Sequence, residues 1–486
     1  LKRYPGSRLE SGDTATGLDG IELMKVVAHK PRDMFYMRKE LRRTYEGDVR
    51  FPDRYLFDNV MMMPDWKPRI WHFDIEAVYV GSKKEMTTVI CIYDSDSDFP
   101  VTFSWYEGAE KNSEMVERNG LKYVHHLHES ESDVHDHFLS YLESRNPDIL
   151  IAHGAHFFDI PHLVRRLKHY KKLSPLGIVR RPPKGGNGYK ACDQPILGRI
   201  VFDTAGMSKD GTGFERVWQD SGKGQLPSRK LSYIAELLGL GSKHDVDASD
   251  WTIWEGTHPD VSFNDYVDYC VQDTLLLKKI DESRHVLGYF LAMQKLCGVS
   301  FDATHNVTRF ARGLMARRTN LKPRSYERME RPDYMGAHVP APIPGIYDDV
   351  GCFDYKGLYP SIIASHNLCW TTKADAPGDN IKTLENGTHW RQDKKGLLPT
   401  IVEEMFELRA QYKHLMNSSK TPEERDGWNT MQMAVKRTMA SLYGMCASPG
   451  WGWCDFDIAE TITFEGRKSI LLLMEKCVEF GYHPVY

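Results

Sequence analysis

The sequence predicts a multidomain α/β protein. Its 486 residues exceed what one hydrophobic core can organise, so about two to four domains are expected. Strand-like and helix-like stretches alternate through the first part of the chain, which is typical of an α/β domain. A strand–turn–helix pattern recurs after a proline-rich segment and two long helical stretches follow, which indicates a second α/β region with helical additions.

The first half contains the clearer periodic patterns. Apolar and polar residues alternate through 68–105, which predicts successive strands, and a strand-like stretch also covers about 49–56. Residues 133–144 form an amphipathic helical pattern, and 148–153 a short buried strand. A helix is expected over 161–170, because Pro161 suits the first turn.

The middle and second half are punctuated by turn residues. The predicted segments in order are a loop at 182–195, helices at 231–240 and 265–280, an extended proline-rich crossing at 320–348, a strand–turn–helix at 350–366, and helices at 398–416 and about 430–443. The polar stretch SSKTPEERDG is expected to separate the last two helices.

Composition narrows the class of protein. Hydrophobic residues make up 41% and aromatic residues 11%, as in an ordered globular chain, and no apolar run approaches the roughly 20 residues of a membrane span. The N-terminal residues LKRYPGSRLESG lack the apolar centre of a signal peptide. A net charge of −4 argues weakly against nucleic acid as a partner, although acidic sites and a basic groove can cancel in the sum.

The nine cysteines are scattered singly. The closest pair, Cys446 and Cys454, lacks zinc-finger spacing, so reduced thiols in the cytosol are expected. Cys270 and Cys352 lie in apolar stretches and are interpreted as packing residues.

Carboxylates in the first half suggest a metal site. Asp74 and Glu76 are two residues apart in FDIEAVY, so on a strand both project from one face. Charges in so apolar a run are costly unless they are paired or bound to metal. The alternative is a solvent-facing edge strand.

Two further segments add polar groups. Asp159 lies in HFFDIPHL just before Pro161, where the alternative is an ordinary helix N-cap. Tyr269 and Asp273 in YCVQD are four apart and share a helix face, where the alternative is a surface polar pair. Two-metal hydrolysis of a phosphodiester needs several such carboxylates around ions ~3.5–4 Å apart.

These three segments, in this order, resemble the exonuclease motifs of DnaQ-like 3′–5′ proofreading domains. GRIVFDTAGMSK, which contains Asp203, and KLSYIAELLGLGSK resemble the version in family B DNA polymerases. The resemblance implies that Asp74, Glu76, Asp159 and Asp273 bind Mg²⁺, with Mn²⁺ as the alternative ion, and that Tyr269 orients the attacking water. Gly154 stands where the family usually has Asn, and His153 or His156 could replace its hydrogen bond.

The second half offers a phosphate-binding pattern. Asp354 is predicted to end a strand, before a turn at Gly357 and a helix near Pro360, where free N–H groups can face phosphate; an N-capping Asp is the alternative. Arg409 and Lys413 share one helix face, for which a solvated face is the alternative. Lys436, Ala440, Tyr443 and Gly444 form a second stripe.

This half resembles the polymerase region of the same family. DYKGLYPSII is similar to motif A, which implies that Asp354 binds a catalytic metal with help from the Tyr355 carbonyl. Gly357, in place of the usual Ser, and Leu358 would donate N–H groups to the triphosphate, and Tyr359 would exclude a 2′-OH.

Three other segments extend the resemblance. KRTMASLYG is similar to motif B, with Ala440 in place of Asn; Lys436 would join Arg409 and Lys413 on the phosphates, while Tyr443 and Gly444 leave room for the base pair. YMGAHVPAPIPGIY resembles the YxGG segment, so Tyr334 and Gly336 would touch template DNA. WGWCDFDIAETITFEGRKSI resembles a palm segment.

The chain is therefore identified as a member of the family B DNA-directed DNA polymerases. The resemblance implies an RNase H-like exonuclease domain, an incomplete palm and two-helix fingers. The expected parts are 1–65 (partial N-terminal domain), 66–300 (exonuclease), 301–348 (helical connection and template-facing segment), 349–395 (palm), 396–445 (fingers) and 446–486 (palm, incomplete).

Motif C, with the second polymerase carboxylate, and the thumb would follow Tyr486. Three explanations are open: a partial sequence, a naturally split enzyme whose partner chain carries motif C and the thumb, or an intein. The full enzyme is expected to copy primer-template DNA from deoxynucleoside triphosphates with proofreading, and a sliding clamp is a further expected partner. These 486 residues alone are expected to retain exonuclease activity without synthesis.

Two rival functions are a stand-alone exonuclease and a non-catalytic DNA-binding subunit. No membrane association is expected. The expected location is the cytoplasm of a bacterial or phage-infected cell, or the nucleus for a eukaryotic or viral source.

Overall fold

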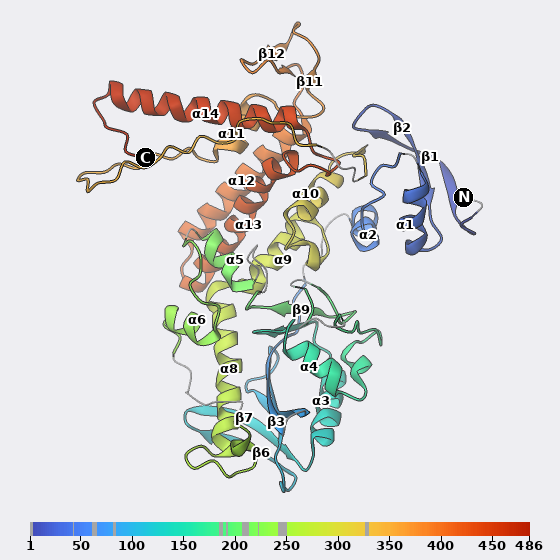
Figure 1. Ribbon diagram of the computed structural model, residues 1–486, viewed down its shortest axis with the longest axis vertical. Helices are drawn as coiled ribbons and strands as arrows, with labels where there is room; N and C mark the ends of the chain where they lie inside the picture. The colour runs from blue at the N-terminus through green and yellow to red at the C-terminus, as the bar shows by residue number, and fades with distance from the viewer. Residues whose placement is uncertain are drawn as a thin grey trace. The chain divides into compact units, whose positions relative to one another are not determined.

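The computed structural model describes residues 3–41, 43–60, 66–80, 84–183, 188–190, 193–206, 213–221, 223–241, 250–325 and 330–486. These residues form helices α1–α14 and three β-sheets (Figure 1), so the expected mixed α/β class is confirmed. The chain divides into two compact units. The first contains Leu1–Met63, Ala292–Lys420 and Met431–Tyr486, and the second contains Pro64–Leu291 and Thr421–Thr430. The finer six-part division stays a prediction.

The second unit is built on a seven-stranded sheet of order β6-β7-β5-β4-β3-β8-β9. Its strands are β3 (Ile70–Val80), β4 (Lys84–Asp94), β5 (Val101–Trp105), β6 (Asn112–Arg118), β7 (Leu121–His128), β8 (Ile149–Ala152) and β9 (Ile200–Asp203). Its helices are α3 (Glu131–Arg145), α4 (Asp159–Arg166), η1 (Tyr170–Leu173), α5 (Gly213–Asp220), α6 (Leu231–Leu237), α7 (Trp251–Trp254) and α8 (Phe263–Arg284).

The β3 strand lies inside this sheet, antiparallel to β4 and parallel to β8. Alternate β3 residues point to opposite faces of the sheet. Phe73 and Ile75 pack with α3 and α4 in one core, whereas the opposite face of β4 packs against α8. Figure 1 shows α8 on one side of β3 and α3 and α4 on the other. Asp74 and Glu76 therefore project toward the α8 side.

The first unit contains the remaining elements. They are β1 (Arg8–Gly17), β2 (Glu22–Val27), α1 (Pro31–Glu40), α2 (Phe51–Asn59), η2 (Phe301–Ala303), α10 (Val307–Ala316), β10 (Leu321–Lys322), α11 (Leu358–Ser365), β11 (Lys373–Ala374), β12 (Ile381–Thr383), β13 (His389–Arg391), α12 (Leu397–Ser418) and α14 (Phe456–Glu479). Two helices, α9 (Val286–Cys297) and α13 (Pro422–Cys446), have residues in both units.

Buried ion pairs bind the N-terminal segment to the middle of the chain within this unit. Arg309 donates to Asp53 at 2.8 Å, and Ser300 donates to the same carboxylate at 2.7 Å. Arg312 pairs with Asp48 at 2.7 Å. Strand β10 also adds to β1 in parallel, so residues before 63 and after 292 form one folded body.

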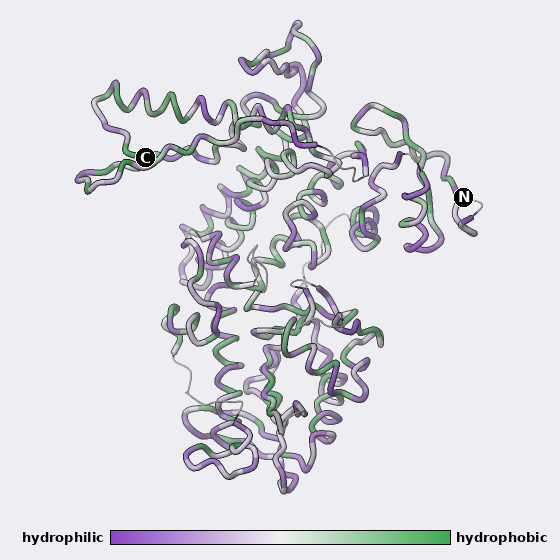
Figure 2. The backbone as a smooth tube through the Cα atoms, viewed as in Figure 1, coloured by the Kyte–Doolittle hydropathy of each residue, from purple (hydrophilic) through white to green (hydrophobic). Residues whose placement is uncertain are grey.

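Helix α14 changes character along its length. Its first half buries apolar residues such as Ile458 and Ile462, and α11 packs against this helix. Its second half leaves Leu471, Leu472 and Val478 about half exposed. Hydrophobic and hydrophilic residues alternate along it (Figure 2). Within the described residues, no helix combines the length and apolar character needed to cross a membrane.

Two strand predictions are wrong. The stretch 49–56 is mostly the helix α2, because Pro52 lies in its first turn and Arg54 pairs with Asp58 one turn later at 2.6 Å. Residues 350–354 are extended but, among the described residues, have no strand beside them with which to form a ladder.

Two helix boundaries also differ from prediction. Helix α4 begins at Asp159 and ends at Arg166, where Leu167 turns to extended backbone, and a separate 3₁₀ turn follows. Helix α13 begins at Pro422 and not near 430, so most of the polar stretch predicted as a loop is helical. Thr421 caps it by accepting the Glu424 N–H at 3.2 Å, and Pro422 suits the first helical position.

Candidate functional site

The carboxylates of Asp74 and Glu76 lie on an interior strand. Asp74 pairs with Cys91 of β4 and Glu76 with Val89, and a register shift follows Glu76. Glu76 is only 9% exposed. The alternative of a solvent-facing edge strand is therefore wrong, since β3 has a neighbour on each side.

Asp159 is the first residue of α4 and is almost completely buried. Its exposed fraction is 2%, and the N-cap position belongs to Phe158, so Asp159 is not an N-cap. Its Oδ1 atom has no hydrogen-bond partner among the described residues. Burial raises the pKa of the Asp159 carboxyl well above its usual range, and the charges of Asp74 and Asp203 raise it further.

The loop before Asp159 is held by Asp203 at the end of β9. The Asp203 carboxylate accepts backbone N–H groups from Gly154, His156 and Ala205, each at 3.0 Å. Gly154 has a φ angle of +120°, a backbone conformation that residues with a side chain rarely adopt. An added Cβ would also lie 3.0 Å from the Phe157 ring. Glycine therefore suits this backbone where the family pattern has Asn.

The two neighbouring histidines are bonded to other groups. His153 bonds through Nδ1 to the Thr204 hydroxyl at 3.0 Å and through Nε2 to the Arg229 carbonyl at 2.7 Å. The His156 Nε2 bonds to the Asp193 carbonyl at 2.7 Å. Both rings thus hold the loop in place, and these bonds do not support the expectation that one of them replaces the missing Asn.

Helix α8 brings Tyr269 and Asp273 to the same region. Both are buried, with exposed fractions of 5% and 4%, so the alternative of a surface polar pair is wrong. Burial and the charges of Asp273, Glu76 and Asp74 raise the pKa of Tyr269. The structure therefore gathers the five residues predicted for the first site, from β3, α4 and α8.

Cys270 is a member of this cluster that the sequence interpretation missed. Its Sγ lies 3.7 Å from Asp74 Oδ2, and one donor atom each from Asp74, Glu76 and Cys270 lie within 4.8 Å of one another. Burial, the Cys91 thiol and the Asp74 charge raise the pKa of Cys270. Its interpretation as a packing residue alone was incomplete; its position three before Asp273 on one helix face was the available signal.

The cluster fits divalent ions of the Mg²⁺ type. Such ions prefer carboxylate oxygens, which Asp74, Glu76, Asp159 and Asp273 supply. The buried Oδ1 of Asp159, without a partner in the described part of the chain, is an oxygen placed for a cation.

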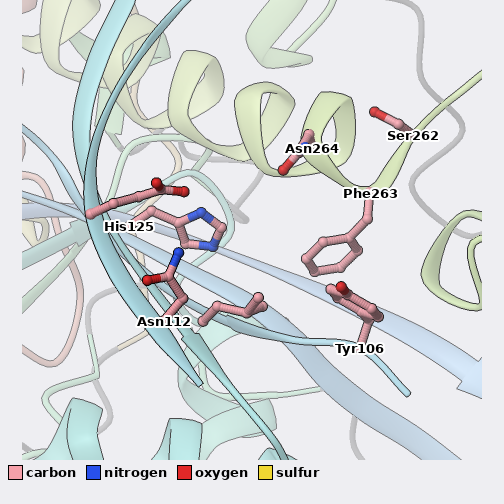
Figure 3. A pocket seen from close by; sticks show the side chains of 8 residues that line it. Tyr106, Asn112, His125, Ser262, Phe263 and Asn264 are labelled. Carbon is pink, nitrogen blue, oxygen red and sulfur yellow. The ribbon is translucent and has the colours of Figure 1, made fainter. Parts of the chain in front are cut away.

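A separate pocket of about 280 Å³ lies where the β6–β7 hairpin meets the start of α8 (Figure 3). Figure 3 shows the rings of Tyr106 and Phe263 together at one side, with centroids 4.9 Å apart. The remainder is lined by Asn112, Glu114, His125, Leu127, Ser262 and Asn264. None of the clustered carboxylates lines this pocket.

The second predicted site begins in an exposed segment. Asp354 is exposed and does not cap α11, whose N-cap is Gly357, so the alternative of an N-capping Asp is wrong. Gly357 has φ +63°, and an added Cβ would lie 3.1 Å from Phe406. Glycine in place of the family's Ser thus matches a left-handed backbone. Tyr355 donates its hydroxyl to the Ser469 carbonyl at 3.0 Å, and Leu358 begins α11.

Four cations gather beside α11. The positive charge of Arg409, with burial and the charges of Lys356 and Lys436, lowers the pKa of Lys413. Arg409 is half-buried and donates to the Gln432 side chain at 3.1 Å. The three predicted cations therefore lie near one another, and Lys356, which directly precedes Gly357, is an addition that the sequence interpretation missed.

Aromatic residues complete this region. The rings of Tyr359 and Tyr443 have centroids 4.7 Å apart, and Gly444 follows in α13. An added Cβ at Gly466 would lie 3.2 Å from the Tyr359 ring. The Tyr359 ring thus lies between Tyr443 and α14.

The segment at Tyr334 and Gly336 is fixed by α14. Arg467 donates to the Gly336 carbonyl at 2.7 Å and to the Met335 carbonyl, and Thr463 donates to the latter at 3.1 Å. The ring of Tyr334 lies 6.2 Å from that of Phe456.

Comparisons with known proteins now identify the class of protein. A sequence profile described as "DNA polymerase family B, exonuclease domain" matches residues 67–209, and one described as "DNA polymerase family B" matches 274–481. Both profiles describe DNA polymerases. The chain belongs to DNA polymerase family B.

Curated relatives agree with this assignment. A "DNA polymerase" of Pyrococcus glycovorans is 25% identical over 96% of this chain and 59% of its own length. "DNA polymerase 1" of Pyrococcus abyssi is 25% identical over 96% of this chain and 60% of its own length. The "DNA polymerase delta catalytic subunit" of Plasmodium falciparum is 27% identical over 69% of this chain and 32% of its own length. The chain spans about three fifths of the archaeal relatives it matches.

These relatives come from archaea and a eukaryote. The expectation of a bacterial or phage source is therefore not borne out.

Proposed function

We propose that residues 66–300 form an RNase H-like 3′–5′ exonuclease that removes nucleotides from the ends of DNA strands. The observation that carries this proposal is the convergence of four carboxylates from β3, α4 and α8 beside Tyr269. The match of residues 67–209 to the family's exonuclease domain supports it.

Each side chain has a separate part in the reaction. Asp74, Glu76, Asp159 and Asp273 would hold Mg²⁺, or Mn²⁺ in its place. When bound, such ions supply charge that stabilises the pentavalent phosphate and make water a better nucleophile. Tyr269 orients that water through its hydroxyl, because it is buried beside Asp273 and Glu76.

The first unit contains the polymerase region of the full enzyme. For this region we propose template-directed DNA synthesis. Arg409, Lys413 and Lys436 neutralise the triphosphate, and the backbone N–H groups of Gly357 and Leu358 donate to it. Tyr359 lies under the sugar and Tyr443 beside the base, with Gly444 leaving room for the pair.

Asp354 and the Tyr355 carbonyl would hold one metal of this polymerase site. Tyr334 and Gly336 would contact template DNA, which requires the fixed backbone that Arg467 provides. A sliding clamp and a separate chain carrying motif C remain proposed partners of the full enzyme. We expect that enzyme to act in the cell compartment that contains the DNA.

The test uses the 486 residues alone with Mg²⁺ and a labelled primer-template. Degradation from the 3′ end without nucleotides is expected, and extension with nucleotides is not, since one polymerase carboxylate does not form a two-metal site. Asp74→Ala should abolish degradation, whereas Asp250→Asn, at the N-cap of α7, should not. Absence of degradation by the folded chain would favour the non-catalytic DNA-binding alternative.

A further inference from the structure

The thiol of Cys270 lies directly among the carboxylates of the proposed exonuclease site. Its Sγ is 3.7 Å from Asp74 Oδ2, and donor atoms of Cys270, Asp74 and Glu76 all lie within 4.8 Å of one another. Cys270 comes from α8, and the two carboxylates come from β3. Neither the general chemistry of Mg²⁺ nor the proposed hydrolysis uses a thiol at this place.

These separations fit the edge of a zinc tetrahedron. With Zn–S bonds of about 2.3 Å and Zn–O bonds of about 2.1 Å, ligand atoms at a tetrahedral angle are about 3.6 Å apart. The observed distance between Cys270 Sγ and Asp74 Oδ2 is 3.7 Å. One ion can therefore bind sulfur and oxygen together without movement of β3 or α8.

A buried acid lies near these three residues. Asp159 is 2% exposed, its Oδ1 lacks a hydrogen-bond partner in the described part of the chain, and the Asp74 charge acts on it. We propose that Cys270, Asp74 and Glu76 form a mixed sulfur–oxygen site for thiophilic divalent ions, Zn²⁺ or Cd²⁺.

The consequence is a site with two kinds of metal selectivity. Mg²⁺ binds the oxygens alone, whereas Zn²⁺ or Cd²⁺ also gains the sulfur, as the thiol proton passes to solvent and the metal–sulfur bond forms. A bound thiophilic ion excludes Mg²⁺ from Asp74 and Glu76, so it inhibits Mg²⁺-dependent hydrolysis. The inhibition rests on the proposed function, but the binding itself does not.

The test is a Cd²⁺ titration of the 486-residue chain, followed by the ultraviolet cadmium–thiolate charge-transfer band. The wild type should show the band, and Cys270→Ser should lose it with a Cd²⁺ affinity lower by about 10–100-fold, since even loss of an outer-shell partner costs this much. Cys297→Ser is the matched control. Cys297 is equally buried, but it lies in the first unit, where its thiol contacts the Thr438 hydroxyl of the same unit.

A parallel assay measures primer degradation in Mg²⁺ with rising Zn²⁺. With each protein's activity taken relative to its own value in Mg²⁺ alone, Cys270→Ser should require about 10-fold more Zn²⁺ than the wild type for half-maximal inhibition. If the chain has no nuclease activity but shows the thiolate band, the proposed function fails and the metal site stands. If it is an active nuclease without the band, the metal site fails alone.

A measurement on the wild type guards against a variant that does not fold. X-ray absorption at the cadmium edge should detect a sulfur neighbour. An all-oxygen shell, or an unchanged band in Cys270→Ser, would overturn the proposal.

Discussion

The side chain of Asp159 is a buried acid at the proposed metal site. It is nearly inaccessible, one of its oxygens has no partner in the described part of the chain, and nearby carboxylates raise its pKa. Such a group is costly to ionise unless a cation lies beside it. A cation bound beside Asp159 would therefore offset the free-energy cost of ionising its buried carboxyl.

Asp159→Asn tests this link. Hydrolysis should fall by at least about 100-fold, because a metal ligand is lost. Mg²⁺ at about 100 times its Kd should stabilise the wild type by about 2.7 kcal/mol, and the variant should lose most of this gain. Thermal unfolding with and without Mg²⁺ measures it; an unchanged Mg²⁺ response in the variant would place the ion elsewhere.

Tyr269→Phe should lower kcat by about 100-fold with little change in KM, because the role proposed for the hydroxyl is to orient water and not to bind the DNA. Tyr289→Phe is the matched control. It removes a buried hydroxyl that donates to Asp220 at 2.5 Å, so it should cost about 1 kcal/mol of stability and leave kcat unchanged. Equal losses in the two variants would indicate a structural role for Tyr269.

At the scale of elements, the β6–β7 hairpin anchors α8. Asp268, next to Tyr269, is buried and accepts two bonds from Arg118, one from Asn119 at 3.0 Å and one from the Tyr123 hydroxyl at 2.6 Å. These bonds fix the turn of α8 that carries Tyr269 and Cys270. The hairpin therefore positions the site without contributing a ligand to it.

Arg118→Met should destabilise the second unit by about 2–3 kcal/mol, since it leaves a buried carboxylate short of partners while Arg118 is itself partly exposed. Lys122→Met removes an exposed pair with Glu117 on the same hairpin and should cost about 0–1 kcal/mol. Urea unfolding compares them. Equal effects would show that the Asp268 bonds do not anchor α8.

Three histidines link β7 and α3. His128 Nε2 lies 3.0 Å from His137 Nδ1, and the His126 and His137 rings have centroids 4.7 Å apart. Burial lowers the pKa values of all three, that of His126 from 6.5 to about 4. Repulsion from the neighbouring rings adds to the shift at His126 and His137, and Lys111 adds to it at His128 and His137, while backbone hydrogen bonds and the Asp133 charge oppose it at His128. The folded state thus favours the uncharged rings.

Their contribution to stability is therefore present above about pH 6.5 and is lost as the pH falls toward 4, because the unfolded chain binds protons first. His137→Gln should lower the acid-unfolding midpoint, whereas the exposed His169→Gln should not. Circular dichroism against pH measures the midpoints. A higher midpoint in His137→Gln would reverse the expected sign.

The sequence patterns predicted the sheet better than its surroundings. Apolar and polar residues alternate in 68–105 because neighbouring side chains of a strand point to opposite faces of the sheet. Strands β3, β4 and β5 could therefore be identified from this pattern. The placement of Asp159 beside Asp74 depends on a loop that Asp203 folds through three backbone bonds, and no local pattern contains that information. Residues 350–354 have strand-like composition, but a ladder depends on a neighbour and not on propensity.

The same limit applies to the sites. Asp74, Glu76, Tyr269 and Asp273 were singled out because their spacing matches strand and helix periods and because their segments resemble the exonuclease motifs. Cys270 and Lys356 were missed because their importance comes from neighbours on other elements.

At the scale of the whole molecule, the chain forms two compact units with separate cores. Calorimetry should show two unfolding transitions, because each unit contains its own sheet and buried ion pairs. Added Mg²⁺ and the substitution Arg118→Met should both change the midpoint temperature of the second unit's transition. Neither should change that of the first unit's transition. One transition with equal calorimetric and van't Hoff enthalpies would contradict this division.

The hydrogen bonds of Asp203 have a practical consequence. They shape the turn before Asp159 entirely with protein groups, so the turn does not depend on an ion for its form. Treatment with a chelator should thus abolish the proposed nuclease activity while leaving the fold of this turn intact, and added ions should restore that activity without a slow refolding phase.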